Sequence, residues 1–414
     1  MKYFNVTILA KGKKRIELVK AESKIAAIKI AKKNNPAQIV QKAVEVPAPM
    51  GTQMGDFFAG IKKSFEPKIN LNNKISAIRQ IAVMTDAGIS IHDAINEVAI
   101  NTENPKLKEI YLNIGNDINA GKSIADSIEP YTEEFGHVAI AMTKLGEQTG
   151  NISGSYAKLA NILEDIRDNL KKFKKAIRTP LITLGAMAVA FTIMIMLVVP
   201  KFKEIFDKFK SELPIPTQIL LFLENILNNY GLYVLVVLGA LTFALIHYYK
   251  NSKEFKYKVD KILINPKFYL IHKVIFFSTM HKYTLVFGEL VKSGIPVSEA
   301  LDTAVGMVDN SYIKEKLLSV NANIARGISL SDSFEQTELF ENMLLQMIRA
   351  GETGGQLDMM LEKVTEYYDA RFQDLIDNLA TYIEPIMMFF IAGLVLLMAL
   401  GIFMPMWDLG KAVK

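Results

Sequence analysis

The chain has 414 residues, of which 50% are hydrophobic and 22% are charged, and its formal net charge at pH 7 is +5. Cysteine is absent, which excludes disulfides, thiolate metal sites and a cysteine nucleophile. The net charge is small and the lysines are spread among acidic residues, so nothing supports direct nucleic-acid binding. We expect separate apolar and polar blocks.

The N-terminal residues predict a small α+β module. Residues 3–20 alternate apolar and polar side chains on both sides of a turn-like Lys-Gly-Lys, which indicates a β-hairpin. Helical spacing follows over 23–31, and 38–46 returns to strand character. We therefore expect a ββαβ module over 1–46, without a cleavable signal, and a Pro- and Gly-rich linker over 47–67.

Three apolar stretches predict transmembrane helices at 180–200, 230–249 and 385–405. Each is about as long as the ~20 residues that a helix needs to cross a bilayer. None contains Asp, Glu, Lys or Arg, groups that a transporter or pump generally needs for its ions. The lack of such groups argues against a transporter or channel built from two repeats, which is the alternative function.

Lys and Arg near the spans predict the orientation. They cluster before the first span and after the second, at Arg167, Lys171, Lys172, Lys174, Lys175 and Arg178 and at Lys250, Lys253, Lys256, Lys258 and Lys261. We expect the N-terminus, helical domain 68–179 and helical domain 250–384 in the cytoplasm. A loop with an amphipathic segment at 201–229 and a short tail at 406–414 then face the periplasm. Anionic lipid is the expected contact of Lys171 to Arg178.

An internal repeat organises the chain. Segments around five landmarks recur at a spacing of 206 residues, falling to 205 in the later pairs. The pairs are Gly88 and Gly294, Gly121 and Gly327, Gly146 and Gly351, Gly150 and Gly355, and Pro180 and Pro385. Apolar residues recur at helical spacing between them, so each repeat predicts a helical bundle that leads into a transmembrane helix. Gly88 and Gly294 follow apparent helix ends, where a positive φ closes the last turn.

This arrangement resembles the inner-membrane platform proteins shared by type II secretion systems and type IV pilus assembly machines, the secretion F or pilus C family. The doubled blocks carry the resemblance: Asp86-Ala87-Gly88-Ile89-Ser90 with Lys292-Ser293-Gly294-Ile295-Pro296, the two Gly-x-Ser blocks at Gly121 and Gly327, and the two Gly-Glu-x-x-Gly blocks at Gly146 and Gly351. Ser90 departs from the Pro-bearing versions of relatives, which leaves its side-chain contacts open.

The resemblance implies a non-enzymatic, homo-oligomeric platform in a bacterial inner membrane. Its implied partners are a cytoplasmic hexameric ATPase, pilins or pseudopilins and other inner-membrane assembly proteins. It implies two cytoplasmic helical bundles and three spans, a mainly α membrane protein with a small N-terminal β-containing module. A role in competence and DNA uptake is also open, since the resemblance does not separate pilus, secretion and uptake machines.

Chemistry in the sequence is sparse, and we expect no catalytic residue and no cofactor. Gly121-Lys122-Ser123 fails as a phosphate loop because Asn116 stands where the leading glycine is required. The five histidines lack ligand spacing and are expected as surface or packing residues.

Glu147 and Glu352 occupy matching places, each three residues after Lys144 or Arg349. They form helical ion pairs with these basic residues or lie at an interface between bundles or subunits; they are also the only candidates for a divalent cation.

Overall fold

The computed structural model describes residues 2–10, 13–21, 24, 28, 31–32, 39–46, 69–201 and 215–412. It separates into two compact units, Met1–Lys68 and Ile69–Lys414. The predicted linker and most of the loop that follows the first span lie outside the described residues.

The first unit is built on a three-stranded antiparallel sheet. The strands are β1 (Lys2–Ala10), β2 (Lys13–Ala21) and β3 (Ile39–Val46) in the order β2-β1-β3. Phe4 and Val6 on β1 and Ala43 on β3 are buried, as the alternation predicted. Helical residues between β2 and β3, among them the buried Ala31, complete the predicted ββαβ order.

The first repeat in the second unit forms an all-helical bundle. Its elements are α3 (Leu71–Asp86), α4 (Ile91–Asn101), α5 (Pro105–Asn119), α6 (Ile124–Ile128), the 3-10 turn η1 (Glu129–Tyr131), α7 (Thr132–Phe135), α8 (His137–Thr149) and α9 (Ile152–Leu197). Polar side chains cap the starts: Ser90 accepts a bond from the Asp93 N–H at 3.1 Å, and Asn104 one from Leu107 at 3.0 Å.

The second repeat forms the same bundle. After α11 (Ile215–Asn251) and α12 (Lys253–Leu263) come α13 (Tyr269–Lys292), α14 (Val297–Gly306), α15 (Ser311–Ile324), α16 (Leu330–Glu335), α17 (Asn342–Gly354), α18 (Leu357–Asp377) and α19 (Leu379–Ala412). The C-terminal part of α13 corresponds to α3, and α18 corresponds to the first half of α9. One hydrophobic core runs through both bundles, from Ile81 and Leu107 to Tyr283 and Phe334.

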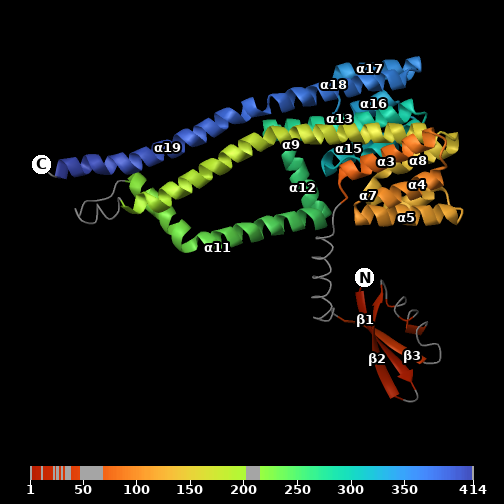
Figure 1. The fold of residues 1–414 in the computed structure, drawn as a ribbon, viewed down its shortest axis with the longest axis horizontal. Helices are drawn as coiled ribbons and strands as arrows, with labels where there is room; N and C mark the ends of the chain where they lie inside the picture. The colour runs from red at the N-terminus through yellow and green to blue at the C-terminus, as the bar shows by residue number, and fades with distance from the viewer. Residues whose placement is uncertain are drawn as a thin grey trace. The chain divides into compact units, whose positions relative to one another are not determined.

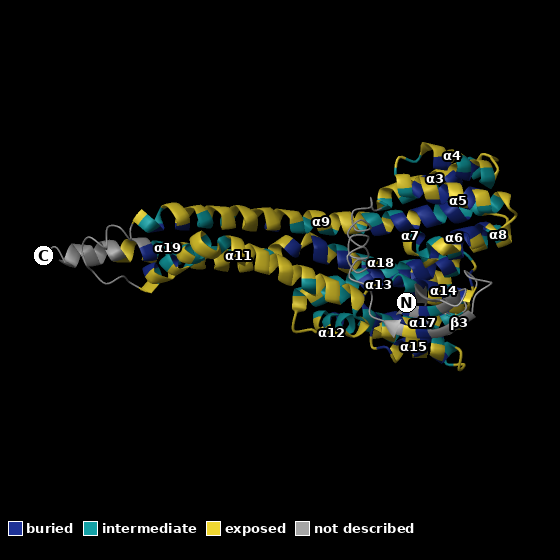
Figure 2. Ribbon diagram, turned by 90° about the horizontal axis from the view of Figure 1, so that it is seen from below, coloured by how far each residue is buried: buried dark blue, intermediate teal, exposed yellow. Residues whose placement is uncertain are grey.

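Three helices in the described part of the chain are long and apolar enough to cross a membrane: Ile152–Lys201, Ile215–Asn251 and Leu357–Gly401. Their apolar parts run away from the bundles, as α9, α11 and α19 in Figure 1. Figure 2 shows these parts mostly as exposed surface, in contrast to the buried interior of the bundles. Phe389 is 78% exposed and Leu232 74%, values that only an apolar surrounding makes favourable. The predicted three-span architecture is confirmed.

The ends of the three apolar helices touch one another. Ile195, Val199 and Leu220 form a small buried cluster. The Thr217 hydroxyl donates to the Gly401 carbonyl at 2.9 Å, which joins the start of α11 to α19. The end of α9 and the start of α11 therefore pack together and against α19, which continues past Gly401 to Ala412.

Candidate functional site

The Glu147 carboxylate caps the N-terminus of α6 in the first bundle. Its Oε1 accepts a hydrogen bond from the backbone N–H of Ile124, and its Oε2 one from Ala125 at 3.1 Å. Ser123 adds its own cap, since its Oγ accepts from the Asp126 N–H at 3.0 Å. The first N–H groups of a helix have no partner within the helix and carry partial positive charge, so a carboxylate is a strong acceptor for them.

Glu352 does the same for α16 in the second bundle. Its Oε1 accepts from the Leu330 N–H at 2.7 Å, and its Oε2 from the Ser331 N–H at 3.1 Å. The Ser331 hydroxyl donates a further bond to Oε2 at 2.9 Å. The Gly-Glu block of each repeat therefore binds the helix that follows its Gly-x-Ser block. We call each arrangement a glutamate clamp, meaning Glu147 on α6 or Glu352 on α16.

The clamps replace the ion pairs considered from the sequence. Lys144 pairs with Glu299 of the second bundle at 3.4 Å, and Arg349 pairs with Asp332 at 2.7 Å, so neither contacts the glutamate three residues on. Sequence spacing placed the partners on one helix, but the carboxylates reach a different helix of the same bundle. A role of these two glutamates at an interface stays a prediction. Among the described residues no group of three or more His, Asp or Glu could hold a metal ion.

The repeated glycines serve two different needs. Six of them have positive φ, in pairs that agree closely: Gly88 (86°) and Gly294 (90°), Gly121 (88°) and Gly327 (85°), Gly150 (71°) and Gly355 (68°). These lie at or just after helix ends, which confirms the helix-terminus prediction for Gly88 and Gly294.

Gly146 and Gly351 permit close packing instead. A Cβ on Gly146 would lie 3.1 Å from the Ile152 Cα, and one on Gly351 2.8 Å from the Met360 Cβ. The glycine before each clamp glutamate thus lets its own helix, α8 or α17, pack tightly against the next one, α9 or α18. Pro180 lies within α9 and Pro385 within α19, inside the long helices rather than between domains.

The two bundles meet through α8 and α14. Besides the Lys144–Glu299 ion pair, His137 approaches Gly306 so closely that a Cβ there would lie 2.7 Å from the His137 Cδ2. A second link joins α9 to the end of α13, where the Lys158 ammonium donates to Ser293 Oγ at 3.1 Å. The repeats are therefore held in a defined arrangement.

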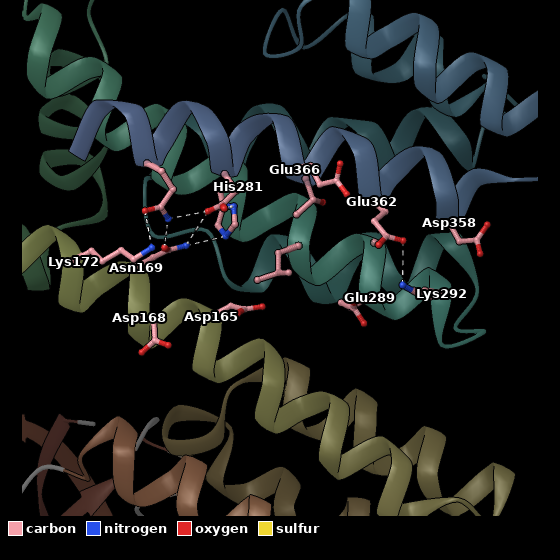
Figure 3. Close-up of a pocket in the computed structure, with 15 residues that line it drawn as sticks. Asp165, Asp168, Asn169, Lys172, His281, Glu289, Lys292, Asp358, Glu362 and Glu366 are labelled. Atoms are coloured by element: carbon pink, nitrogen blue, oxygen red, sulfur yellow. Dashed lines mark hydrogen bonds and ion pairs between the residues drawn. The ribbon is translucent and has the colours of Figure 1, made fainter. Parts of the chain in front are cut away.

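A polar cleft of about 420 Å³ separates the bundles along α9, α13 and α18 (Figure 3). Two lysines and a histidine line it together with seven carboxylates: Asp165, Asp168, Glu289, Asp358, Glu362, Glu366 and Asp369. Lys292 and Glu362 form an ion pair at 3.1 Å within it. Acidic groups outnumber basic ones, so the cleft carries net negative charge.

A hydrogen-bond network closes one end of this cleft. Asn169 of α9 donates to His281 Nε2 at 3.1 Å and accepts from the Gln373 amide at 2.6 Å. His281 Nδ1 lies 3.4 Å from Asp369 Oδ1, and the Lys172 ammonium donates to Gln373 at 2.9 Å. Residues of both repeats take part, so the network couples α9 to α13 and α18.

His281 is the titratable group at the centre of this network. It is 6% exposed, and burial lowers its pKa below the ordinary value of 6.5, while the neighbouring Asp369 acts in the opposite direction. The neutral imidazole fits the contacts: Nε2 accepts from Asn169 and the Nδ1–H faces Asp369. From the sequence, His281 was expected only as a surface or packing residue. Its partners lie in segments far away in the chain, so local spacing held no signal of the network.

Comparison with known proteins identifies the repeats. The family model described as type II secretion system (T2SS), protein F matches this chain twice, over residues 77–200 and 283–405.

Curated relatives match over most of their length. The type IV pilus assembly protein PilC of Pseudomonas aeruginosa is 28% identical over 335 residues, which cover 81% of this chain and 89% of the relative. PilC of Myxococcus xanthus is 26% identical, covering 81% and 80%. The type II secretion system protein F of Vibrio cholerae is 24% identical, covering 81% and 82%.

Proposed function

Because this chain belongs to the family of type II secretion system protein F, with both of its repeats matched, we propose that it is the non-enzymatic inner-membrane platform of a type IV pilus or type II secretion machine. It couples a cytoplasmic hexameric ATPase to the assembly of pilin or pseudopilin subunits. The relatives named for pilus assembly and for type II secretion support the class of machine.

The observation that carries the proposal is the connection between bundle and membrane helix. α9 begins among the core residues Tyr156 and Leu159 of the first bundle and ends at Leu197 beside the cluster of Ile195, Val199 and Leu220. A partner that moves the bundle therefore moves a membrane helix through one continuous backbone. Such a connection suits a protein that transmits force, and it needs no bond chemistry of its own.

We propose the orientation from the charges at the membrane end. The two helical domains at 68–179 and 250–384 lie in the cytoplasm, with the basic residues before α9 enters the bilayer and after α11 leaves it at the same face. The segments 201–229 and 406–414 lie on the periplasmic side. Cysteine labelling tests this directly because the chain has no cysteine of its own.

The labelling experiment uses two single variants, Gln148→Cys and Asp408→Cys, in spheroplasts treated with a membrane-impermeant maleimide. We expect Asp408→Cys to be labelled in intact spheroplasts and Gln148→Cys only after the membrane is permeabilised. The opposite pattern would invert the topology and with it the ATPase contact.

Co-purification tests the platform role itself. A tagged chain is isolated from gently solubilised membranes, with the untagged chain as control, and its companions are identified by mass spectrometry. We expect a hexameric secretion-type ATPase and pilin-like proteins. The identity of the pilins then separates pilus, secretion and DNA-uptake machines. Recovery of a solute-binding or ion-coupled partner in their place would favour the transporter alternative.

A further inference from the structure

The contact between the two bundles uses unlike faces of the repeat. On α8 the face is formed by His137, Ala141 and Lys144, which share one side of the helix at i, i+4 and i+7. On α14 it is formed by Glu299, Thr303 and Gly306. Contacts at both ends of this face fix an antiparallel arrangement, with Lys144 on Glu299 and His137 on Gly306. The central residues are buried, Ala141 at 8% and Thr303 at 9% exposed.

The repeat duplicates both faces, but the duplicates lie open. α17 corresponds to α8 and presents Asn342, Gln346 and Arg349 at the places of His137, Ala141 and Lys144. Gln346 is exposed, whereas its counterpart Ala141 is buried. Met343, beside this face, is 54% exposed.

α4 corresponds to α14 in the same way. It presents Asp93, Glu97 and Ile100 at the places of Glu299, Thr303 and Gly306. Glu97 is exposed, whereas its counterpart Thr303 is buried, and Ile100 is 63% exposed. The first bundle thus has an open face on α4 that corresponds to the contact face of α14. The second bundle has an open face on α17 that corresponds to the contact face of α8.

The charges on the open faces match those of the closed contact. Arg349 stands at the place of Lys144, and Asp93 at the place of Glu299, so a basic and an acidic residue are retained at these places. Arg349 already pairs with Asp332 at 2.7 Å within its own bundle, and its guanidinium has further N–H donors for a second carboxylate. Gln346 and Glu97 would meet at the centre, where an amide can donate to a carboxylate. In the same antiparallel geometry, pairing α4 with a second α4 would oppose the two Glu97 carboxylates. Pairing two α17 helices would set each Arg349 on Asn342, without an acidic partner from the other copy.

The two open faces lie on opposite edges of the double bundle. In Figure 1 α17 lies along the upper edge and α4 toward the lower one, and in Figure 2 α4 is at the top with α17 below. Both faces therefore cannot be satisfied within one chain, and two different neighbours can bind at the same time.

We propose that α17 of one copy of this chain binds α4 of a second copy, repeating between chains the α8–α14 contact that exists within the chain. The interface is heterologous, so further copies add in the same direction until a ring closes or the assembly ends. The inference rests on the self-association included in the proposed platform function and specifies its surface.

Cysteine cross-linking in membranes tests the contact without a background, since the natural chain has no thiol. Glu97→Cys and Gln346→Cys are expressed alone, together on differently tagged chains, and combined in one chain, then oxidised. We expect no dimer from either variant alone, a dimer carrying both tags from the mixture, and oligomers larger than a dimer from the combined variant. Lys144→Cys with Glu299→Cys in one chain is the positive control for oxidation across an α8–α14 pair.

Two results would overturn the proposal. Dimers from Glu97→Cys alone or Gln346→Cys alone would show a symmetric contact between like faces. A mixture without hetero-dimers, while the positive control oxidises, would show that another molecule or the bilayer covers α4 and α17.

A charge exchange separates the contact from general damage to the fold. Arg349→Glu on the chain with Gln346→Cys should lower the hetero-dimer yield about threefold to fivefold, as expected for an exposed ion pair turned repulsive. Asp93→Arg on the chain with Glu97→Cys should restore it. Failure of the double exchange to restore the yield would contradict the predicted pairing. If cross-links form but no ATPase co-purifies, the platform proposal fails and this contact stands.

Discussion

The helix pair α3–α9 of the first repeat and its counterpart α13–α18 of the second share one geometry but differ in their electrostatics. Ile75 of α3 is buried at the position where α13 carries His281. Arg79 of α3 pairs with Glu164 of α9 at 2.6 Å, whereas the matching residues of the second repeat are Leu285 and Asp369. Asp369 lies beside His281 instead. The first pair thus holds an ion pair, whereas the second holds a histidine whose pKa is lowered by burial.

Comparison of the two repeats separates the parts that the fold requires from those that have diverged. The glutamate clamps, the six positive-φ glycines and the close-packed Gly146 and Gly351 are kept in both copies because each closes a helix end or a helix crossing. The faces toward the inter-bundle cleft and the open edges have diverged. The second repeat therefore places a buried histidine at the junction of the bundles, where the first repeat has Ile75.

The largest effect is expected from loss of a clamp. Glu352→Ala removes three hydrogen bonds to Leu330 and Ser331, and Glu147→Ala removes two, so we expect losses of about 2–4 and about 1–3 kcal/mol of stability. Circular dichroism melts of the detergent-solubilised chain measure the order. Glu335→Ala, at an exposed carboxylate, is the control. Equal losses at the two clamps would remove the extra role given to the Ser331 hydroxyl.

The pH dependence of stability is expected to arise in the second repeat. The pKa of His281 is lowered by burial, so the unfolded chain takes up this proton more readily than the folded one. The stabilisation from the neutral imidazole is therefore complete above about pH 6.5 and is lost as the pH falls from there through the folded pKa. Melting temperatures between pH 8 and 5 should show this decrease.

His281→Ile gives the second repeat the residue of the first and should flatten this part of the pH profile. His92→Gln, at a half-buried histidine of α4 that does not line the cleft, serves as the control and should leave the decrease below pH 6.5 in place. A profile of His281→Ile that still falls below pH 6.5 as in the natural chain would assign the titration to another group.

A smaller effect is expected from the fixed ion pair of the first repeat. Arg79→Leu introduces the residue that stands at the matching place in the second repeat and removes the bond to Glu164. Both side chains are about one third exposed, so solvent screens the pair and the loss should be about 0.5–1 kcal/mol, reduced by salt. Melts at low and high ionic strength measure it. A loss that salt does not change would indicate packing of the Arg79 stem instead of charge.

The smallest effect concerns the single residue between α18 and α19. Asn378 interrupts the helix there, and its amide donates to the Asp374 carbonyl at 2.9 Å, while the matching Phe173 lies within the unbroken α9. Asn378→Phe should raise stability by up to about 0.5 kcal/mol if the helix becomes continuous. Phe173→Asn is the reciprocal variant. Hydrogen exchange of the amides at 376–380 measures the change, and unaltered exchange in Asn378→Phe would mean that packing, not Asn378, imposes the break.

Much of the architecture could be predicted from the sequence, because it depends on local signals. Spans of ~20 apolar residues, glycines after helix ends and the doubled blocks at constant spacing each reflect a requirement within a few turns of chain. The same reasoning anticipated Gly88 and Gly294 at helix termini. It also identified Glu147 and Glu352 as equivalent residues.

The contacts of these glutamates could not be predicted in the same way. Each carboxylate binds the start of a helix that lies more than twenty residues earlier in the chain. Only the tertiary packing of the bundle brings these residues into contact. The His281 network joins residues more than one hundred positions apart for the same reason. A histidine within an apolar helix was visible in the sequence, but its partners were not.

The unbroken course of α9 has a mechanical consequence. A helix of 46 residues at about 1.5 Å per residue is roughly 70 Å long, even with Pro180 inside it, and packed side chains hold both of its ends. A small tilt at Ile152 becomes a much larger sideways displacement at Leu197, as at the far end of a lever. The counterpart of α9 in the second repeat is divided by one turn residue, Asn378, and backbone hydrogen bonds continue on both sides of it, from Asn378 to Asp374 and from Tyr382 to Asn378. Both repeats therefore join a bundle to a membrane helix through nearly continuous helical backbone.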